Sequence, residues 1–380
     1  MMRRKEAWFA LIAVAGTTAL VLGLAEVALR FMPVASAMRA QAVNAENPVY
    51  RFAPNRDFVY SRGWNFALFN RGHVNNAGFV NDQDYRKEDA SPLLAVVGDS
   101  YIEALMVPYA ETVHGRLAKA REGRLRVYSF GASGAPLSQY LVWARHAVKD
   151  YGASRLVINV VGNDFDESLA AYRTGHGFWH YVSGANNELN LRLFEYRPTV
   201  LGKIAAASAL GRYLVFNLEI GQRWLELRAL LFGGPALAAP RYAGNTSTDT
   251  GEPRMRDSLA GIEAFFRDLP VLVGLPPDRV LFTLDGLRYP DLAAAAAGTY
   301  FDLMRRAFRR KAESLGYDVI DLDDFFFEHY RRTSELFEFP GDAHWSGAGH
   351  RVVFDAVMAS RFFSRIGDNR GSVAASGRME

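Results

Sequence analysis

The sequence predicts an α/β fold, a three-layer sandwich in which helices cover both faces of a five-stranded parallel sheet. Short apolar runs rich in branched residues recur along the chain and end at glycine or aspartate, as buried parallel strands do. The stretches between them have the length and periodicity of helices. The composition agrees, because 49% of the 380 residues are hydrophobic and 13% are aromatic, which supplies a large core and excludes a disordered chain.

A membrane anchor is predicted over residues 1–30. A stretch of about nineteen uncharged residues follows Arg3, Arg4 and Lys5. At roughly 1.5 Å per residue in a helix it is about 28 Å long, close to the hydrocarbon core of a bilayer. Basic residues on its amino side predict a cytoplasmic amino end. In a bacterium the protein would then cross the inner membrane once, with the rest of the chain in the periplasm.

Two alternatives to an anchor stay open at this point. Ala35-Ser36-Ala37 resembles the cleavage site of a signal peptide, although signal-peptide apolar cores are usually about 7–15 residues long. The segment could also be a buried helix of a soluble protein. The formal net charge of +3 agrees with the membrane interpretation, because the amino-terminal basic cluster supplies most of it. No dense basic stripe remains, so we expect no nucleic-acid partner.

The exported part begins with residues 31–92, which predict a linker and an irregular approach segment. The regular α/β domain is predicted over residues 93–365. Its helices include Leu137–Asp150 and Thr299–Leu315, the latter with a run of arginines that we expect on a solvated face. The five predicted strands are residues 93–97, 125–130, 155–161, 280–284 and 317–322.

An insertion at about residues 166–254 interrupts the strand–helix alternation. It contains an aromatic-rich part and an apolar helical stretch around Ile204–Leu231 that carries too many charges for a second membrane span. A packed lid is favoured for it, and a cap subdomain or a membrane-surface helix stays open. Residues 366–380 are polar and glycine-rich and are expected to form a disordered tail.

Chemistry-bearing residues follow four of the five strands. In an open parallel sheet, ligands bind beyond the carboxyl ends of the strands. Strand one is followed by Gly98-Asp99-Ser100, strand two by Gly131-Ala132-Ser133-Gly134, and strand three by Gly162-Asn163-Asp164. About twenty residues after strand five comes Gly341-Asp342-Ala343-His344-Trp345. Serine, glycine, asparagine and an aspartate–histidine pair therefore gather at one edge, which points to hydrolytic chemistry.

The order of these four blocks resembles the SGNH (GDSL-type) hydrolase family over roughly residues 93–363. The resemblance implies a flavodoxin-like arrangement of the sheet, with Ser100 as the nucleophile, His344 as the general base and Asp342 as the residue that orients it. It implies an oxyanion hole made of the Ser100 N–H, the Gly134 N–H and the Asn163 side-chain amide. No cofactor and no metal are expected.

The residue types fit these roles on physical grounds. A serine hydroxyl becomes a useful nucleophile when an imidazole takes its proton, and the pKa of histidine suits that exchange near neutral pH. A carboxylate on the other ring nitrogen fixes the tautomer of the imidazole. Asp342 and His344 lie two residues apart, so both side chains point to one face of an extended segment. An amide donor in an oxyanion hole typically lowers the barrier by about 3–4 kcal/mol.

The spacing of the last block widens the range of predicted reactions. The family usually has two residues between aspartate and histidine, whereas this chain has only Ala343. A single spacer is similar to the block in alginate O-acetyltransferase-like proteins, which transfer an acyl group. We therefore expect either an ester hydrolase or an O-acyltransferase of the cell envelope, acting on an acylated small molecule, glycan or lipid. The alternative is a catalytically idle SGNH-fold component that binds or assembles an envelope polysaccharide.

Several neighbouring residues are expected to be structural. Asp99 is predicted to hold the nucleophile turn, and Tyr101 replaces a leucine common in the family, which we treat as a minor change. Gly131 competes with Gly134 for the second block. His350 is expected to pack in the fold. His176 and His180 are spaced like a metal pair, but no third ligand has matching spacing, so a loop role is favoured.

Overall fold

A computed structural model describes residues 4–186, 188–221, 224, 250–340 and 342–366. The chain divides into two compact units. We call residues 1–39, 57–72 and 198–238 the helical unit, and residues 40–56, 73–197 and 239–380 the sheet unit. The predicted disordered tail, apart from residue 366, lies outside the described residues.

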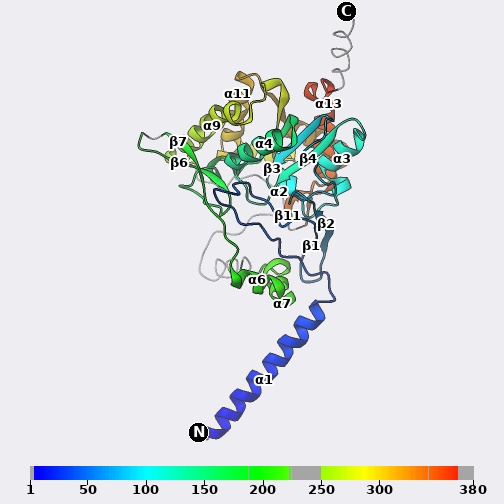
Figure 1. Cartoon of the computed structure of the whole chain (residues 1–380), viewed down its shortest axis with the longest axis vertical. Helices are drawn as coiled ribbons and strands as arrows, with labels where there is room; N and C mark the ends of the chain where they lie inside the picture. The colour runs from blue at the N-terminus through cyan, green and yellow to red at the C-terminus, as the bar shows by residue number, and fades with distance from the viewer. Residues whose placement is uncertain (1–3, 187, 222–223, 225–249, 341, 367–380) are drawn as a thin grey trace, which may run out of the picture. The chain divides into compact units, whose positions relative to one another are not determined.

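The sheet unit contains the predicted five-stranded parallel sheet, in the order β4-β3-β5-β8-β9. Figure 1 shows β3 and β4 of this sheet side by side. This order places the first strand of the sheet between the second and third, which is the flavodoxin-like arrangement. Every residue of β3 is buried, which explains its continuous apolar run. The strands are β3 (Leu93–Gly98), β4 (Arg126–Gly131), β5 (Ala153–Val160), β8 (Val280–Leu284) and β9 (Asp318–Asp321).

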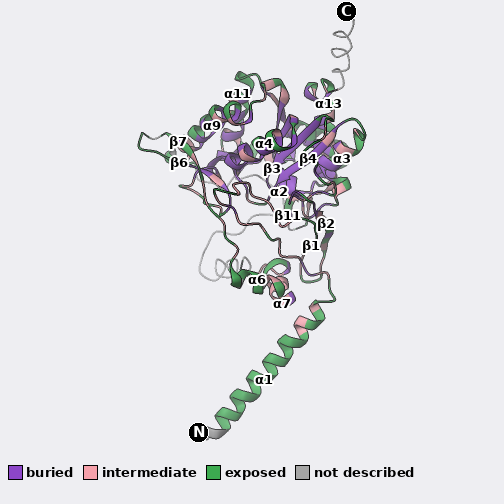
Figure 2. Ribbon diagram, in the orientation of Figure 1, coloured by how far each residue is buried: buried purple, intermediate pink, exposed green. Residues whose placement is uncertain are grey.

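Two layers of helices cover the sheet, so the predicted three-layer sandwich is confirmed. Side chains alternate along each strand, and Val96 and Leu281 point into a core shared with α3 and α13. Phe282 points to the other face, where it meets Phe308 of α11 and Phe265 of α9. Buried residues form most of this interior (Figure 2). The helices are α2 (Ser100–Glu103), α3 (Val113–Ala120), α4 (Leu137–Tyr151), α5 (Asp164–Glu167), α9 (Glu252–Val273), α10 (Pro290–Ala296), α11 (Tyr300–Ser314), α12 (Leu322–Thr333), α13 (Gly347–Ala359) and α14 (Arg361–Ser364), with short 3₁₀ turns η1 (Tyr109–Glu111) and η3 (Pro277–Arg279).

One residue of the arginine run in α11 departs from the expected solvated face. Arg306, Arg309 and Arg310 are exposed, but Arg305 is buried. Arg305 forms ion pairs with Asp321 at the end of β9 and with Asp323 at the start of α12, the latter at 2.8 Å. The prediction for Arg305 was wrong because sequence spacing does not reveal that carboxylates from β9 and α12 lie against this helix.

The insertion contributes to both units. Its aromatic-rich part forms an antiparallel hairpin of β6 (Trp179–Ser183) and β7 (Leu189–Leu193) in the sheet unit, and two further strands there are β10 (Glu338–Phe339) and β11 (Asp342–Trp345). The apolar stretch breaks into α6 (Val200–Ala207), α7 (Ala209–Arg212) and the π-helical turn η2 (Tyr213–Asn217) of the helical unit. Strands β1 (Arg56–Arg62) and β2 (Leu68–Val74) pair with each other, and most of their residues belong to the helical unit.

The amino-terminal helix α1 (Arg4–Leu29) also belongs to the helical unit. Within the described residues it is the one helix long and apolar enough to cross a membrane, over Glu6–Leu29, with a mean hydropathy of 2.0. None of that segment is buried against the rest of the protein (Figure 2). The structure therefore contradicts the interpretation of this segment as a buried core helix.

Candidate active site

Three of the predicted site residues form one hydrogen-bonded chain at the carboxyl edge of the sheet. Ser100 is the first residue of α2, which follows β3 after a single residue. Its Oγ lies 2.8 Å from Nε2 of His344. The Nδ1 of His344 lies 2.5 Å from Oδ1 of Asp342. A hydroxyl, an imidazole and a carboxylate in this order can move a proton from the hydroxyl oxygen to the imidazole.

The turn that presents Ser100 is fixed by Asp99. The carboxylate of Asp99 accepts a hydrogen bond from the Tyr101 N–H at 3.0 Å and caps α2, as expected for a structural residue. Burial raises the pKa of Asp99 to about 6. Gly98 precedes it because a methyl group at that position would lie 2.5 Å from Ile102 of α2. The helix can therefore begin directly against the end of the strand.

The turn that presents His344 is fixed partly by Asp342 itself. The Asp342 carboxylate accepts a hydrogen bond from the backbone N–H of His344 at 3.0 Å, in addition to its bond with the ring. Its side chain is only 1% exposed, whereas that of His344 is 30% exposed. The imidazole can thus reach a substrate while its orienting carboxylate stays shielded from water.

A buried polar cluster holds the backbone between these two residues. The carbonyl oxygen of Ala343 accepts hydrogen bonds from Nη1 of Arg288 at 2.6 Å and from the Tyr101 hydroxyl at 3.1 Å. Arg288 is completely buried and pairs with Asp285 at 2.7 Å, and Asp285 also accepts from the indole N–H of Trp345 at 3.0 Å. The turn is therefore clamped by charge-assisted hydrogen bonds in a dry environment.

Sequence reasoning missed this cluster. Asp285 directly follows strand β8, and its place at the carboxyl end of a buried strand is a signal that could have identified it. Tyr101, which we expected to be a minor change, has a larger role, because its ring also contacts the His344 ring with centroids 4.9 Å apart. The structure also shows that the backbone of Arg288 is left-handed, with φ of 65°, a feature that the sequence does not indicate.

The candidate oxyanion hole is less completely assembled. Gly134 has φ of +77°, a conformation that favours glycine, and its N–H has no hydrogen-bond acceptor among the described residues. Gly131 instead ends β4, where a methyl group would meet Asp99 and Glu103 backbone at 3.0 Å, so its role there is close packing. The Asn163 amide donates to Glu167 at 3.0 Å and does not cap α5.

Two charged side chains, Glu167 and Arg173, lie beside the candidate oxyanion hole. Glu167 forms an ion pair with Arg173, whose Nη2 would lie 3.1 Å from a methyl group added to Gly134. Arg173, Glu167 and Asn163 therefore form a linked row beside Gly134. An amide nitrogen carries two N–H donors, so one can bond Glu167 while the other stays available to a ligand.

Glu103 holds the backbone next to the candidate oxyanion hole. It lies at the end of α2 and accepts hydrogen bonds from the N–H of Ser133, at 2.9 Å, and from the Ser133 hydroxyl. Burial raises the pKa of Glu103 to about 7. The contact fixes the backbone immediately before Gly134.

His350 and His180 have structural partners, whereas His176 is exposed. Nδ1 of His350 accepts the Val113 N–H at 3.2 Å, and burial places the pKa of His350 well below its ordinary value, as suits a neutral packing residue. His180 is bonded to the Glu167 carbonyl and the Gly175 N–H, both at 2.9 Å. Among the residues that the structure describes, no group of three or more His, Asp or Glu is placed to hold a metal ion.

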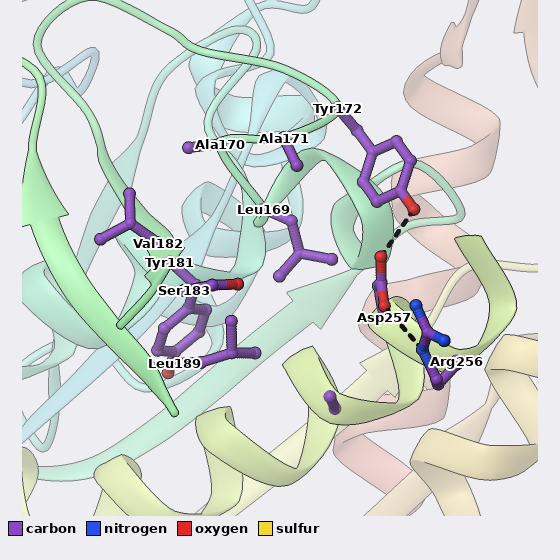
Figure 3. Close-up of a pocket in the computed structure, with 11 residues that line it drawn as sticks. Leu169, Ala170, Ala171, Tyr172, Tyr181, Val182, Ser183, Leu189, Arg256 and Asp257 are labelled. Carbon is purple, nitrogen blue, oxygen red and sulfur yellow. Dashed lines mark hydrogen bonds and ion pairs between the residues drawn. The ribbon is translucent and has the colours of Figure 1, made fainter. Parts of the chain in front are cut away.

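A separate cavity of about 790 Å³ lies between the β6–β7 hairpin and α9 (Figure 3). Leu169, Tyr181 and Leu189 form its buried floor. Tyr172 donates a hydrogen bond to Asp257 at 2.9 Å across its rim. No member of the serine–histidine–aspartate chain lines this cavity.

Comparison with known proteins gives similarity only at the level of solved structures. No family model matches the sequence. No curated protein matches it either. A lipase from a goat rumen metagenome is 12% identical and covers 72% of this chain and 98% of its own, with a TM-score of 0.38. An acetyl xylan esterase is 12% identical, over 70% and 98%, with a TM-score of 0.38. A member of the lipolytic G-D-S-L family from Veillonella parvula is 12% identical, over 71% and 98%, with a TM-score of 0.35.

Proposed function

We propose that this protein is a serine-dependent acyl ester hydrolase or O-acyltransferase of the SGNH type. The observation that carries the proposal is the chain of 2.8 Å and 2.5 Å contacts joining Ser100, His344 and Asp342. Ser100 and His344 are 244 positions apart in sequence, so the fold brings two distant segments together here. A purely structural serine has no need of an oriented imidazole.

The proposed reaction begins with the acylation of Ser100. Ser100 Oγ attacks the carbonyl carbon of an ester, and its proton passes to His344 Nε2 while the carbonyl oxygen becomes an oxyanion. The Ser100 N–H, the Gly134 N–H and the Asn163 amide stabilise that charge. When the intermediate collapses, the ester C–O bond breaks and His344 gives its proton to the departing alcohol, which leaves an acyl-enzyme. Asp342 keeps His344 in the required tautomer and stays ionised throughout.

The acyl-enzyme can be resolved in two ways. Water or a sugar hydroxyl attacks the acyl carbon and gives its proton to His344, the bond between that carbon and Ser100 Oγ breaks, and His344 returns the proton to Ser100. Attack by water gives a hydrolase, and attack by a sugar hydroxyl gives a transferase. The single residue between Asp342 and His344 favours the transferase branch as part of the proposal. Partitioning of a preformed acyl-enzyme between water and an added oligosaccharide tests it, because purely hydrolytic loss would remove the transferase branch.

The proposed location is the outer face of a bacterial inner membrane, with α1 retained as an anchor and an acylated glycan or lipid as the substrate. The hydrogen bonds of Ala35 and Ser36, which lie in the segment that resembles a cleavage site, support the retention of α1. Ala35 donates its N–H to Asn217 at 3.1 Å, and Ser36 accepts the Val59 N–H at 3.0 Å. Glu26, inside α1, accepts the Leu210 N–H at 2.8 Å. Removal of residues 1–37 would take these partners away from the helical unit.

The decisive experiment is Ser100→Ala against the unaltered protein on a short aryl ester. We expect a loss of at least about 10⁴-fold in kcat with unchanged thermal unfolding, because no other group can form the acyl-enzyme. Ser314→Ala, an exposed serine of α11, is the matched control and should leave the rate unchanged. Equal rates for Ser100→Ala and the unaltered protein would remove the nucleophile from the proposal.

An idle binding component is the second candidate. The bond between the Asn163 amide and Glu167 favours it, since one of the two N–H donors of that amide is already occupied. A fluorophosphonate probe separates the two candidates. Labelling of Ser100 that depends on His344 supports the enzyme, and absence of labelling in the unaltered protein supports the idle component.

A further inference from the structure

The helical unit carries several exposed apolar side chains on elements connected to α7, which packs on α1. In α6, Val200 is 72% exposed and Ile204 is 63% exposed. In η2, Val215 is 61% exposed, and its neighbour Phe216 is also exposed. Trp64, between β1 and β2, is 74% exposed. Single exposed apolar residues are ordinary on soluble proteins, but a group concentrated on short connected elements marks a contact surface.

These residues occupy neighbouring elements. Val200 and Ile204 are four residues apart, so they lie on the same face of α6. α6 packs on α7, and α7 packs on η2. The hydroxyl of Tyr213, at the start of η2, donates to the Trp64 carbonyl at 2.8 Å. The exposed apolar side chains therefore lie on one connected group of elements. Figure 2 shows α6 coloured as exposed.

Hydrogen bonds tie this structure to α1. The Glu26 carboxylate accepts the Ala209 N–H at 3.1 Å, the Leu210 N–H at 2.8 Å and the Ser208 hydroxyl at 2.9 Å. These groups form the amino end of α7, which a carboxylate satisfies well. Glu26 lies three residues before the end of α1. The exposed apolar surface is thus fixed at the end of the helix that we propose to cross the membrane.

We infer that α6 and η2 lie in the headgroup region of the same phospholipid bilayer that α1 crosses. The surface has the composition that interfacial segments use: branched aliphatic and aromatic side chains for the boundary with the acyl chains, and basic groups for the phosphates. Lys203, between Val200 and Ile204, and Arg30, just beyond α1, are both exposed, and Arg30 also forms an ion pair with Glu26 at 2.9 Å. The inference rests on the proposed anchoring of α1 and assigns a second membrane contact to the insertion.

The chain has no cysteine, so single labels can be placed in the full-length protein without removing native thiols. Val200→Cys and Val215→Cys report on the proposed surface. Val14→Cys reports on the middle of α1, and Val271→Cys, 80% exposed on α9 of the sheet unit, is the matched water-facing control. Each variant carries an environment-sensitive fluorophore and is reconstituted in nanodiscs of phosphatidylethanolamine and phosphatidylglycerol. Quenching is measured with aqueous iodide and with lipids that carry a nitroxide near the headgroup.

We expect labels at positions 200 and 215 to be quenched by the nitroxide lipids, with iodide quenching constants at least about three-fold smaller than at position 271. The label at position 14 should be inaccessible to iodide. If position 14 is shielded but positions 200 and 215 behave like position 271, the anchor stands and the surface inference is overturned. Shielding of positions 200 and 215 from iodide without lipid quenching also overturns it, because a protein then covers the surface. Iodide access at position 14 removes the anchor and the inference together.

Discussion

The two halves of the proposed active site are supported in different ways. The half that moves the proton rests on buried groups: the Asp342 side chain is 1% exposed, and Arg288, which clamps the Ala343 carbonyl, is fully buried. The half proposed to bind the oxyanion has one buried support, Glu103, but the charged groups next to the Asn163 amide reach the surface. The side chains of Glu167 and Arg173 are 20% and 46% exposed.

This difference implies that substitutions and salt affect the two halves of the site differently. Buried charge-assisted hydrogen bonds keep one geometry, and removing a partner leaves an unsatisfied group that water cannot reach. An exposed ion pair contributes little free energy and is screened by salt. The proton-moving half should therefore be set before substrate arrives, whereas the orientation of the Asn163 amide should depend on its charged neighbours.

The largest expected effect comes from the buried half. Asp342→Asn should lower kcat on a short aryl ester by about 10⁴-fold, because an amide cannot hold His344 in the tautomer whose Nε2 accepts the Ser100 proton. Steady-state kinetics at neutral pH measures the loss. Glu335→Gln is the matched control and should leave kcat unchanged, since Glu335 pairs with a different histidine, His329, at 3.0 Å. Equal losses in both variants would mean that the Asp342 contact has no special role.

The next effect belongs to the other half. Asn163→Ala should lower kcat by about 10²–10³-fold with little change in KM, because an oxyanion donor acts mainly in the transition state. Asn190→Ala, an exposed amide of β7, should not change either constant. A loss below about three-fold for Asn163→Ala would exclude the amide as an oxyanion donor and leave only backbone donors.

The sequence is informative about the sheet and the four blocks because both are local patterns. Runs such as Leu93–Gly98 reveal buried strands, and the glycine, serine and asparagine follow their strands directly. The supports of the site are different, because they depend on contacts between distant positions. Tyr101 and Ala343 are 242 residues apart, and Arg288 and Ala343 are 55 apart. Nothing near Arg288 in sequence indicates that its guanidinium meets that carbonyl.

The burial of Arg305 has the same cause. Its spacing in α11 is that of a solvated residue, yet the fold brings Asp321 and Asp323 beneath it. Sequence patterns locate elements and the residues at their ends, whereas polar contacts inside the protein follow from how the elements pack.

A third test uses the buried carboxyl beneath Gly134. The pKa of Glu103 is about 7 in the folded protein, against an ordinary value of 4.5, so the folded state binds more protons than the unfolded chain between these values. The free energy of unfolding should therefore fall as pH rises from about 4.5 to about 7, by up to about 3 kcal/mol. Glu103→Gln keeps an acceptor for Ser133 and removes this contribution.

Urea unfolding at about pH 5 and about pH 8 measures the difference. The unaltered protein should lose more stability between the two values than Glu103→Gln does. Asp99, whose pKa is raised to about 6 by burial, contributes a slope of the same sign in both proteins. A stability difference between the two proteins that is the same at both pH values would contradict the assignment.

The smallest effect concerns Glu167. Glu167→Ala should lower kcat by about ten-fold, because the Asn163 amide loses the acceptor that orients it, a contribution of about 1.4 kcal/mol. Glu167→Gln keeps an acceptor and should restore most of the rate, while removing the ion pair with Arg173 and with it the sensitivity of kcat to salt. The decisive measurement is a double-mutant cycle with Asn163→Ala. In that background Glu167→Ala should have no further effect; an undiminished ten-fold loss would mean that Glu167 acts on the reaction through a group other than the Asn163 amide.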